Sequence, residues 1–138
     1  MIELDGNHLT IDQIFRVAYE NESVKLSADG QLNINTSYRL LQGILAMDKP
    51  VYGINTGFGI FSDQRIPVSD SSKLSRNLIM SHAVGTGIPF SSQVVRAAML
   101  VRANTLAKGY SGVRAEVVQT LLSMLNAGVI PEVPSQGS

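Results

Sequence analysis

The chain has 138 residues, of which 44% are hydrophobic and only 16% are charged, against a usual charged share of about 25%. Eleven basic residues balance eleven acidic ones, so the surface has no net positive charge with which to bind nucleic acid or anionic lipid. The absence of cysteine excludes a disulfide framework, a thiolate metal site and a cysteine nucleophile. This composition predicts a protein that buries faces against a partner, or a piece of a larger one.

The sequence contains neither a targeting signal nor a membrane span. Its first residues lack the basic start and apolar run of a signal peptide. The most apolar stretch, 94–107, is too short to cross a bilayer and contains two arginines. We therefore expect a soluble, cytoplasmic protein.

The first expected helix begins after Thr10, whose spacing from Gln13 is typical of a capping box. Its apolar face would consist of Ile11, Ile14, Phe15 and Ala18. Residues 24–26 favour a short extended piece, and 28–30 a turn. A second helix is expected over 31–47, with the apolar stripe Ile34, Tyr38, Leu41 and Leu45. Pro50 ends it, because the residue before a proline avoids the helical region.

Three further helices are expected in the second half of the chain. The first starts at about 69–70 and runs to 83 or 84, and the glycines of 85–89 break it. The next covers 92–108, with Gly109 as its left-handed C-terminal residue, and the last covers 113–126 and ends at Gly128. The tail, 129–138, has no helical periodicity. The fold class is therefore mainly α, with a glycine-rich loop at 52–59.

The stretch 94–107 is apolar around its whole circumference, with ten apolar residues among fourteen. A helix of this kind is buried on all sides and needs more neighbours than this chain supplies. We therefore expect a larger helical bundle, either an incomplete domain or an oligomer core. Arg96 and Arg102 are expected to meet partners at the ends of this helix or outside the chain.

The glycine-rich loop runs Tyr52-Gly53-Ile54-Asn55-Thr56-Gly57-Phe58-Gly59. It lacks the third glycine of a dinucleotide-binding loop and the Gly-Lys-Ser/Thr of a P-loop, so it is not a phosphate-binding loop. Its glycines allow positive φ and a compact turn that would hold Tyr52 on a rigid support. Tyr52 is then either an interfacial side chain on a packed turn or a general acid or base.

His82 lies between Leu78 and Ile79 on the face of its expected helix. It is either a core histidine with satisfied hydrogen bonds or an imidazole at a pocket wall that contacts a ligand. Ser81 and His82 are not expected to form a catalytic dyad, because adjacent helical residues do not face each other. The acidic residues show no spacing typical of a metal or glycosidase site, so no metal is expected.

Four ordered segments together carry a resemblance to a known family. They are 52–59, 76–85 (Arg-Asn-Leu-Ile-Met-Ser-His-Ala-Val-Gly), 101–114 and 125–131. The chain resembles the N-terminal part of the aromatic amino-acid ammonia-lyases over nearly its whole length, most weakly over the first forty residues. The resemblance implies the N-terminal part of a large helical bundle of the fumarase/aspartase-like architecture, assembled as a homotetramer whose sites draw on several subunits. Residues 1–138 would be one incomplete domain with no internal boundary.

The resemblance also implies a chemistry. Family members eliminate ammonia from an amino acid with 4-methylidene-imidazol-5-one (MIO), an electrophile formed from an internal Ala-Ser-Gly. The similarity is greatest to members that convert L-histidine to trans-urocanate in histidine breakdown. By motif, Tyr52 would transfer a proton near the substrate and His82 would contact the substrate imidazole. The loop support would come from Gly53, Asn55, Thr56, Gly57, Phe58 and Gly59.

One departure from the family pattern limits this hypothesis. No Ala-Ser-Gly occurs in the 138 residues, so we expect this chain alone to be inactive, as an N-terminal segment of the enzyme. Two alternatives stay open. One is a tyrosine ammonia-lyase or aminomutase with the same prosthetic group, and the other is a non-catalytic helical assembly module.

Overall fold

The computed structural model describes residues 1–47, 50–56 and 71–137. These residues form five helices and four short strands. In chain order they are β1 (Ile2–Leu4), α1 (Ile11–Tyr19), β2 (Val24–Leu26), α2 (Ala28–Ala46), α3 (Ser71–His82), β3 (Thr86–Pro89), α4 (Ser92–Ala107), α5 (Ala115–Asn126) and β4 (Pro134–Gln136). The expected mainly α fold class is confirmed. Among the helices of these described stretches, none is long and apolar enough to cross a membrane.

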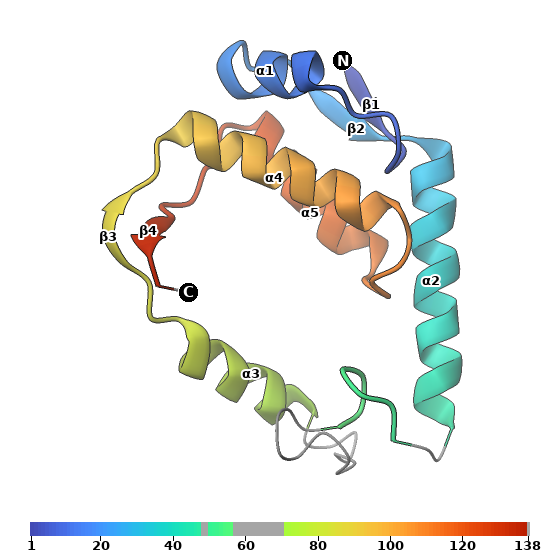
Figure 1. Ribbon diagram of the computed structural model, residues 1–138. Helices are drawn as coiled ribbons and strands as arrows, with labels where there is room; N and C mark the ends of the chain where they lie inside the picture. The colour runs from blue at the N-terminus through green and yellow to red at the C-terminus, as the bar shows by residue number, and fades with distance from the viewer. Residues whose placement is uncertain (48–49, 57–70, 138) are drawn as a thin grey trace.

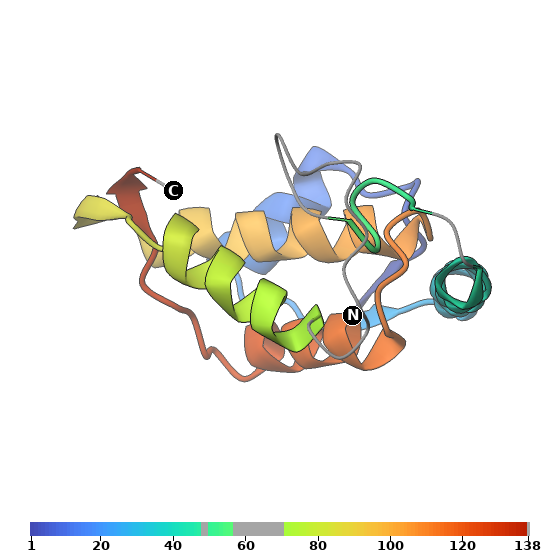
Figure 2. The same cartoon turned by 90° about the horizontal axis from the view of Figure 1, so that it is seen from below.

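The helix α4 lies at the centre of the fold and packs against α1 and α5 (Figure 1). Strands β1 and β2 lie beside α1, and α2 runs on from β2 along one side of the fold (Figure 1). Figure 2 shows the β3–β4 pair at one end of the α4–α5 pair and α2 at the other end. The packed core therefore consists of α1, α4, α5 and the first two strands, together with Ile34 from the first half of α2.

This core consists of aliphatic side chains that the described elements cover almost completely. The α4 members line one side of that helix, where burial of apolar surface stabilises the packing. The fully covered members include Leu4, Val17, Val24, Leu100, Ala103, Val118 and Leu125.

The outer side of α4 is not covered within the described residues. Val94 is 49% exposed and Val101 is 44% exposed, and Arg102 lies on the exposed side as well. The expected burial on all sides is therefore not met inside this chain. It would need apolar neighbours beyond the elements described.

Arg96 meets its partners inside the chain, so the expected alternative of partners outside the chain is wrong for this residue. Its side chain is buried, with Nε and Nη2 donating to the Val17 carbonyl at 3.0 and 2.8 Å, and Nη1 donating to the Leu125 carbonyl at 3.1 Å. Both carbonyls belong to the last turns of helices, α1 and α5, where backbone acceptors lack intrahelical partners and the helix dipole is negative. The guanidinium therefore caps two helices at once.

Local signals at helix ends are mostly confirmed. Thr10 and Gln13 form the expected capping box at the start of α1. Gly109 and Gly128 have φ of +78° and +69°, as expected for residues that follow α4 and α5. The turn expected at 28–30 is wrong, because Ser27 caps the Gly30 N–H at 3.0 Å and α2 starts there.

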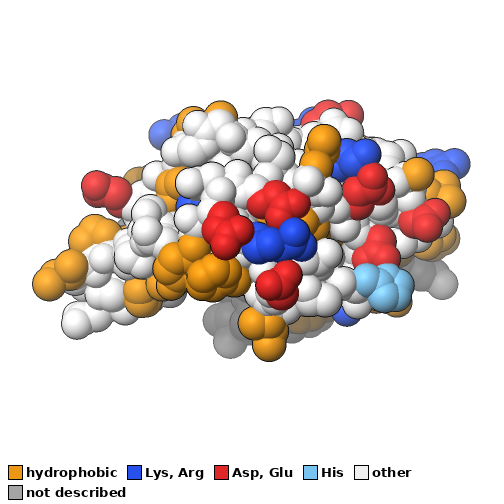
Figure 3. All heavy atoms as spheres, turned by 90° about the horizontal axis from the view of Figure 1, so that it is seen from above, with side chains coloured by type: hydrophobic (Ala, Val, Ile, Leu, Met, Phe, Trp, Pro, Cys, Tyr) orange, Lys and Arg blue, Asp and Glu red, His pale blue; other side chains and the backbone are white. Residues whose placement is uncertain are grey.

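The apolar face expected for α1 is partly wrong. Ile11 is 87% exposed and Phe15 is 51% exposed, and Val17 is buried towards α4 instead. Phe15 stacks on Tyr19 at a ring separation of 4.8 Å. Figure 3 shows the face that carries α1, where acidic, basic and apolar side chains are mixed.

The extended piece at 24–26 is confirmed, and it pairs in parallel with β1, which was not expected. The register joins Ile2 to Val24 and Leu4 to Leu26. The carboxamide of Asn126 hydrogen-bonds to the backbone of β2. Its Oδ1 accepts from the Val24 N–H at 2.9 Å, and its Nδ2 donates to the Val24 carbonyl at 2.8 Å. Asn126 thus takes the place of a neighbouring strand.

Residues within the expected break at 85–89 and within the tail 129–138 form a second pair of strands. Strands β3 and β4 pair antiparallel, with Thr86 opposite Gln136 and Pro89 opposite Pro134. The pairing was missed because the strands are short and far apart in the sequence. The helix before them ends at His82 instead of 83–84, and its expected start at 69–70 lies outside the described residues.

Candidate functional site

Segment 50–56 forms a tight turn that presents Tyr52. The N–H groups of Ile54 and Asn55 donate to the Val51 carbonyl at 3.1 and 3.2 Å. The Asn55 side chain closes the turn, because its Oδ1 accepts from the Val51 N–H at 2.7 Å. Gly53 has φ of +77°, a conformation that residues with a side chain rarely adopt.

The turn divides its side chains between interior and surface. Asn55 and Thr56 are buried, whereas Tyr52 is 65% exposed. The backbone beside Tyr52 is therefore fixed while its ring faces outward. The other loop residues of the sequence hypothesis, Gly57, Phe58 and Gly59, lie outside the described residues.

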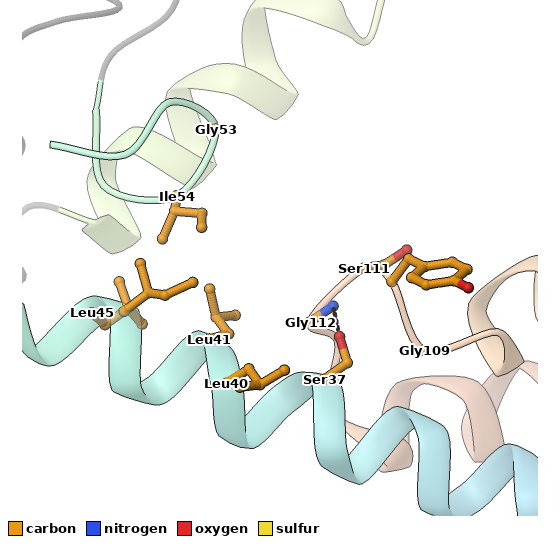
Figure 4. Close-up of a pocket in the computed structure, with 11 residues that line it drawn as sticks. Ser37, Leu40, Leu41, Leu45, Gly53, Ile54, Gly109, Ser111 and Gly112 are labelled. Carbon is orange, nitrogen blue, oxygen red and sulfur yellow. Dashed lines mark hydrogen bonds between the residues drawn. The ribbon is translucent and has the colours of Figure 1, made fainter.

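A groove of about 570 Å³ lies between α2, segment 50–56 and the loop 109–112 (Figure 4). Ile54 points from the segment towards Leu41 and Leu45 of α2. The Gly112 N–H donates to Ser37 Oγ at 3.0 Å and holds the loop against the helix. The lining is Ser37, Leu40, Leu41, Ile44, Leu45, Gly53, Ile54, Gly109, Tyr110, Ser111 and Gly112. This lining suits an apolar group and supplies no acid or base apart from the tyrosine hydroxyl.

The sequence interpretation did not identify this groove. Leu41 and Leu45 were expected to face a core, since their spacing marks an apolar helix face. They are only partly buried, and the groove exists because segment 50–56 and loop 109–112 approach the same side of α2. Nothing in the local pattern distinguishes a groove wall from a core face.

His82 is the last residue of α3 and is exposed, so the core-histidine alternative is wrong within this chain. Its Nδ1 lies 2.9 Å from the Leu78 carbonyl oxygen and 2.9 Å from Ser81 Oγ. Ser81 Oγ in turn donates to the same carbonyl at 3.0 Å. The Leu78 carbonyl oxygen, Ser81 Oγ and His82 Nδ1 thus lie within hydrogen-bond distance of one another near the end of α3.

Ser81 approaches the imidazole although adjacent helical residues were not expected to meet. Both side chains turn back to the Leu78 carbonyl, which brings them together. A nucleophile–base dyad does not result, because the hydroxyl proton of Ser81 is directed to the Leu78 carbonyl and the ring nitrogen faces that acceptor too.

Tyr52 and His82 lie on separate elements of the described chain. Neither lines the groove described above. Tyr52 follows α2, whereas His82 ends α3, a helix of 12 residues that is about 18 Å long. In Figure 1, segment 50–56 lies towards the start of α3, and His82 is at the other end.

The pronounced charge interactions lie away from both residues, near the N-terminus. Asp5 accepts hydrogen bonds from the ring Nδ1 of His8 and from the backbone N–H groups of Asn7 and His8, and these bonds lower the pKa of Asp5. The bond from the ring to the Asp5 carboxylate raises the pKa of His8. A hydrogen bond from the N-terminal ammonium, at 2.9 Å, lowers the pKa of Glu22. No group of three metal-binding side chains occurs in the part of the chain that the structure describes.

The sequence model of the family described as aromatic amino acid lyase matches residues 9–138. The chain belongs to this family. A relative from Natranaerobius thermophilus, named histidine ammonia-lyase, is 49% identical over 138 residues, which is 100% of this chain and 27% of that protein. The chain thus spans about a quarter of the length of the curated relatives that it matches.

Solved structures of the family share the fold. Tyrosine aminomutase from Streptomyces globisporus superposes with a TM-score of 0.92 at 35% identity, over 99% of this chain and 26% of that one. Histidine ammonia-lyase from Trypanosoma cruzi superposes with a TM-score of 0.89 at 36% identity, over 99% of this chain and 26% of that one. The expected position in a large helical lyase architecture is therefore confirmed.

The residues present do not fit the MIO group that the resemblance implies. The group needs Ala-Ser-Gly, and the single Ser-Gly pair in the sequence is Ser111-Gly112, which follows Tyr110. That pair belongs to the loop packed on α2. These residues therefore contain no Ala-Ser-Gly from which the electrophile could form.

Proposed function

We propose that this chain is the N-terminal part of a cytoplasmic ammonia-lyase that converts L-histidine to trans-urocanate and ammonia in histidine degradation. The observation that carries the proposal is the 49% identity to a histidine ammonia-lyase across the whole chain. The support comes from the curated relatives, because the solved structures of the tyrosine aminomutase and of the histidine ammonia-lyase are nearly equally similar, at 35% and 36% identity. The 138 residues form one incomplete domain of the enzyme.

The prosthetic group MIO belongs to another part of the complete enzyme. These residues lack Ala-Ser-Gly, so by themselves they catalyse no elimination. Their contribution is to place side chains at the substrate.

Tyr52 is the proton-transfer residue of the proposed site. Its support is the turn closed by Asn55 and Gly53, which fixes the backbone and leaves the ring outward. A fixed position matters because a general acid or base acts only within hydrogen-bond reach of the proton that it moves.

His82 binds the imidazole of the substrate. It is exposed at the end of α3, and its Nδ1 is already engaged by its own helix. Tyr52 and His82 lie apart in one chain, which suits a site assembled from several subunits of a homotetramer. The half-exposed Val94 and Val101 of α4 supply apolar surface for such an assembly.

The test is an assay of the complete protein with L-histidine and with L-tyrosine in parallel. We expect urocanate, detected by its ultraviolet absorbance, as the main product. Faster conversion of L-tyrosine to coumarate or to β-tyrosine would instead identify a tyrosine lyase or aminomutase. A folded, tetrameric protein without any turnover would indicate the assembly module.

Tyr52→Phe in the complete enzyme tests the residue assignment. Loss of a general acid or base lowers kcat by about 10²–10⁴-fold, and the circular dichroism spectrum should not change. Tyr19→Phe is the matched control, because Tyr19 is 60% exposed on α1 and its stacking on Phe15 needs only the ring. Near-normal turnover of Tyr52→Phe would contradict the role.

A further inference from the structure

The end of α3 has a hydrogen-bond arrangement that determines which ring nitrogen of His82 carries the proton. Nδ1 lies 2.9 Å from the Leu78 carbonyl oxygen. A carbonyl oxygen only accepts, so Nδ1 must be the donor and must carry the hydrogen.

Ser81 reinforces the same assignment. Its hydroxyl donates to the Leu78 carbonyl at 3.0 Å, which leaves the lone pairs of Oγ free to accept. Oγ is 2.9 Å from Nδ1 of His82. The Nδ1–H group therefore has two acceptors beside it, a carbonyl and a hydroxyl oxygen.

The other ring nitrogen has the opposite property. A neutral imidazole has one donor and one acceptor nitrogen, so Nε2 is left as an acceptor. No described residue hydrogen-bonds to Nε2, and the side chain is exposed. His82 thus offers an outward acceptor whose identity is set by its own helix.

We propose that Ser81 is a positioning residue which, with the Leu78 carbonyl, holds His82 in the Nδ1–H tautomer and makes Nε2 the acceptor for an N–H or O–H donor on the substrate ring. This inference rests on the proposed function, in which His82 contacts that ring. A ring with a donor, such as an imidazole, pairs with Nε2. A phenyl ring without one leaves the acceptor unpaired, which costs affinity.

The first test measures the tautomer directly in the 138-residue chain. The chain has two histidines, so His8→Gln leaves His82 as the single imidazole. In a ¹⁵N-histidine-labelled sample under mildly alkaline conditions, where imidazoles are neutral, we expect a protonated Nδ1 and an unprotonated Nε2. Ser81→Ala should shift the population towards Nε2–H, whereas Ser81→Thr retains the hydroxyl and should not.

The control for these spectra is Ser123→Ala, which removes an exposed hydroxyl from α5. Two results would overturn the proposal. One is an Nε2–H tautomer of His82 in the chain that retains Ser81. The other is averaged ring signals that Ser81→Ala leaves unchanged, which would show that the end of α3 does not hold the imidazole.

The second test uses the complete enzyme. Ser81→Ala should raise KM for L-histidine about five-fold, the loss of one neutral hydrogen bond, with kcat nearly unchanged. Ser81→Thr should restore KM. An unchanged KM, or a loss confined to kcat, contradicts a positioning role.

The two tests separate this inference from the proposed function. If the complete protein does not act on L-histidine, the proposed function fails, and the ¹⁵N spectra still decide the tautomer. If it acts on L-histidine while the ring is Nε2–H, the positioning proposal alone fails.

Discussion

Replacement of Arg96 by methionine should destabilise the fold by about 2–4 kcal/mol. Methionine keeps the apolar stem but removes the donors to the Val17 and Leu125 carbonyls. The Leu125 carbonyl keeps the Gly128 N–H at 3.3 Å, whereas the Val17 carbonyl has no other donor among the described residues. One orphaned buried acceptor costs about 1–3 kcal/mol, and loss of a positive charge from two helix C-termini adds about 0.3–1 kcal/mol each.

The assay is urea denaturation followed by circular dichroism, with the free energy of unfolding extrapolated to water. Arg102→Met is the matched control, because Arg102 lies on the same helix, is exposed, and has no hydrogen bond within the described chain. It should change stability by less than about 0.5 kcal/mol. Arg96→Lys should fall between the two, since one ammonium does not reproduce the fork of the guanidinium.

An Arg96→Met variant as stable as the unmodified chain, or more stable, would contradict the capping role of Arg96. Such a result is known for some buried charge networks, where the cost of desolvating the ions exceeds their attraction. It would mean that the two carbonyls do not need the guanidinium. An unaltered slope against urea is required for the comparison, because a changed slope signals a different unfolded or native state.

Two further predictions concern helix ends and pH. Gly109→Ala should destabilise the chain more than Gly128→Ala, as measured by thermal melting. Both glycines have positive φ, but a Cβ at Gly109 would lie 2.5 Å from the Asn33 carbonyl oxygen, whereas a Cβ at Gly128 would meet nothing within 4 Å. The Asp5–His8 pair should stabilise the fold most between the ordinary pKa values of its members, 3.8 and 6.5. The lowered pKa of Asp5 makes its contribution present above 3.8 and lost as pH falls, and the raised pKa of His8 makes its contribution present below 6.5 and lost as pH rises through the folded-state value. Urea denaturation at pH values that extend below 3.8 and above 6.5 should show both losses, and His8→Asn should abolish the alkaline one. An unchanged pH profile in that variant would exclude the pair as the cause.

The elements that the sequence predicts well are those set by neighbouring residues. The Thr10–Gln13 capping box and the left-handed Gly109 depend on side chains and backbone within one turn, so the local pattern contains the cause. The turn expected at 28–30 is wrong because a turn signal and a helix signal compete there. Gly30 suggested a turn, but the Ser27 hydroxyl caps its N–H and starts α2.

The elements that were missed depend on distant partners. Arg96 finds its acceptors 79 and 29 residues away, and no periodicity indicates which carbonyls lie there. The β3–β4 ribbon pairs a strand that precedes α4 in the sequence with a strand that follows α5. Short strands without a hydrophobic alternation leave no local signal of such pairing.

The candidate site divides in the same way. The glycine pattern predicts the compact turn beside Tyr52, and Gly53 adopts the positive φ that it allows. The roles of Tyr52 and His82 come from the family resemblance and stay predictions. The approach of Ser81 to His82 was missed because helical geometry was judged from Cβ directions, whereas the contact arises from a shared carbonyl.

The bond from Asn126 to β2 has a consequence for the order in which a ribosome can complete this fold. Val24 and Asn126 are 102 residues apart, so about 5–20 s of translation separate them at about 5–20 residues per second. During that interval the apolar side of β1 and β2 is first without α4, until residue 107 has been made, and then without α5. The nascent chain therefore presents a hydrophobic surface to chaperones until α5 has been synthesised, and β1 and β2 settle only after α5 has emerged.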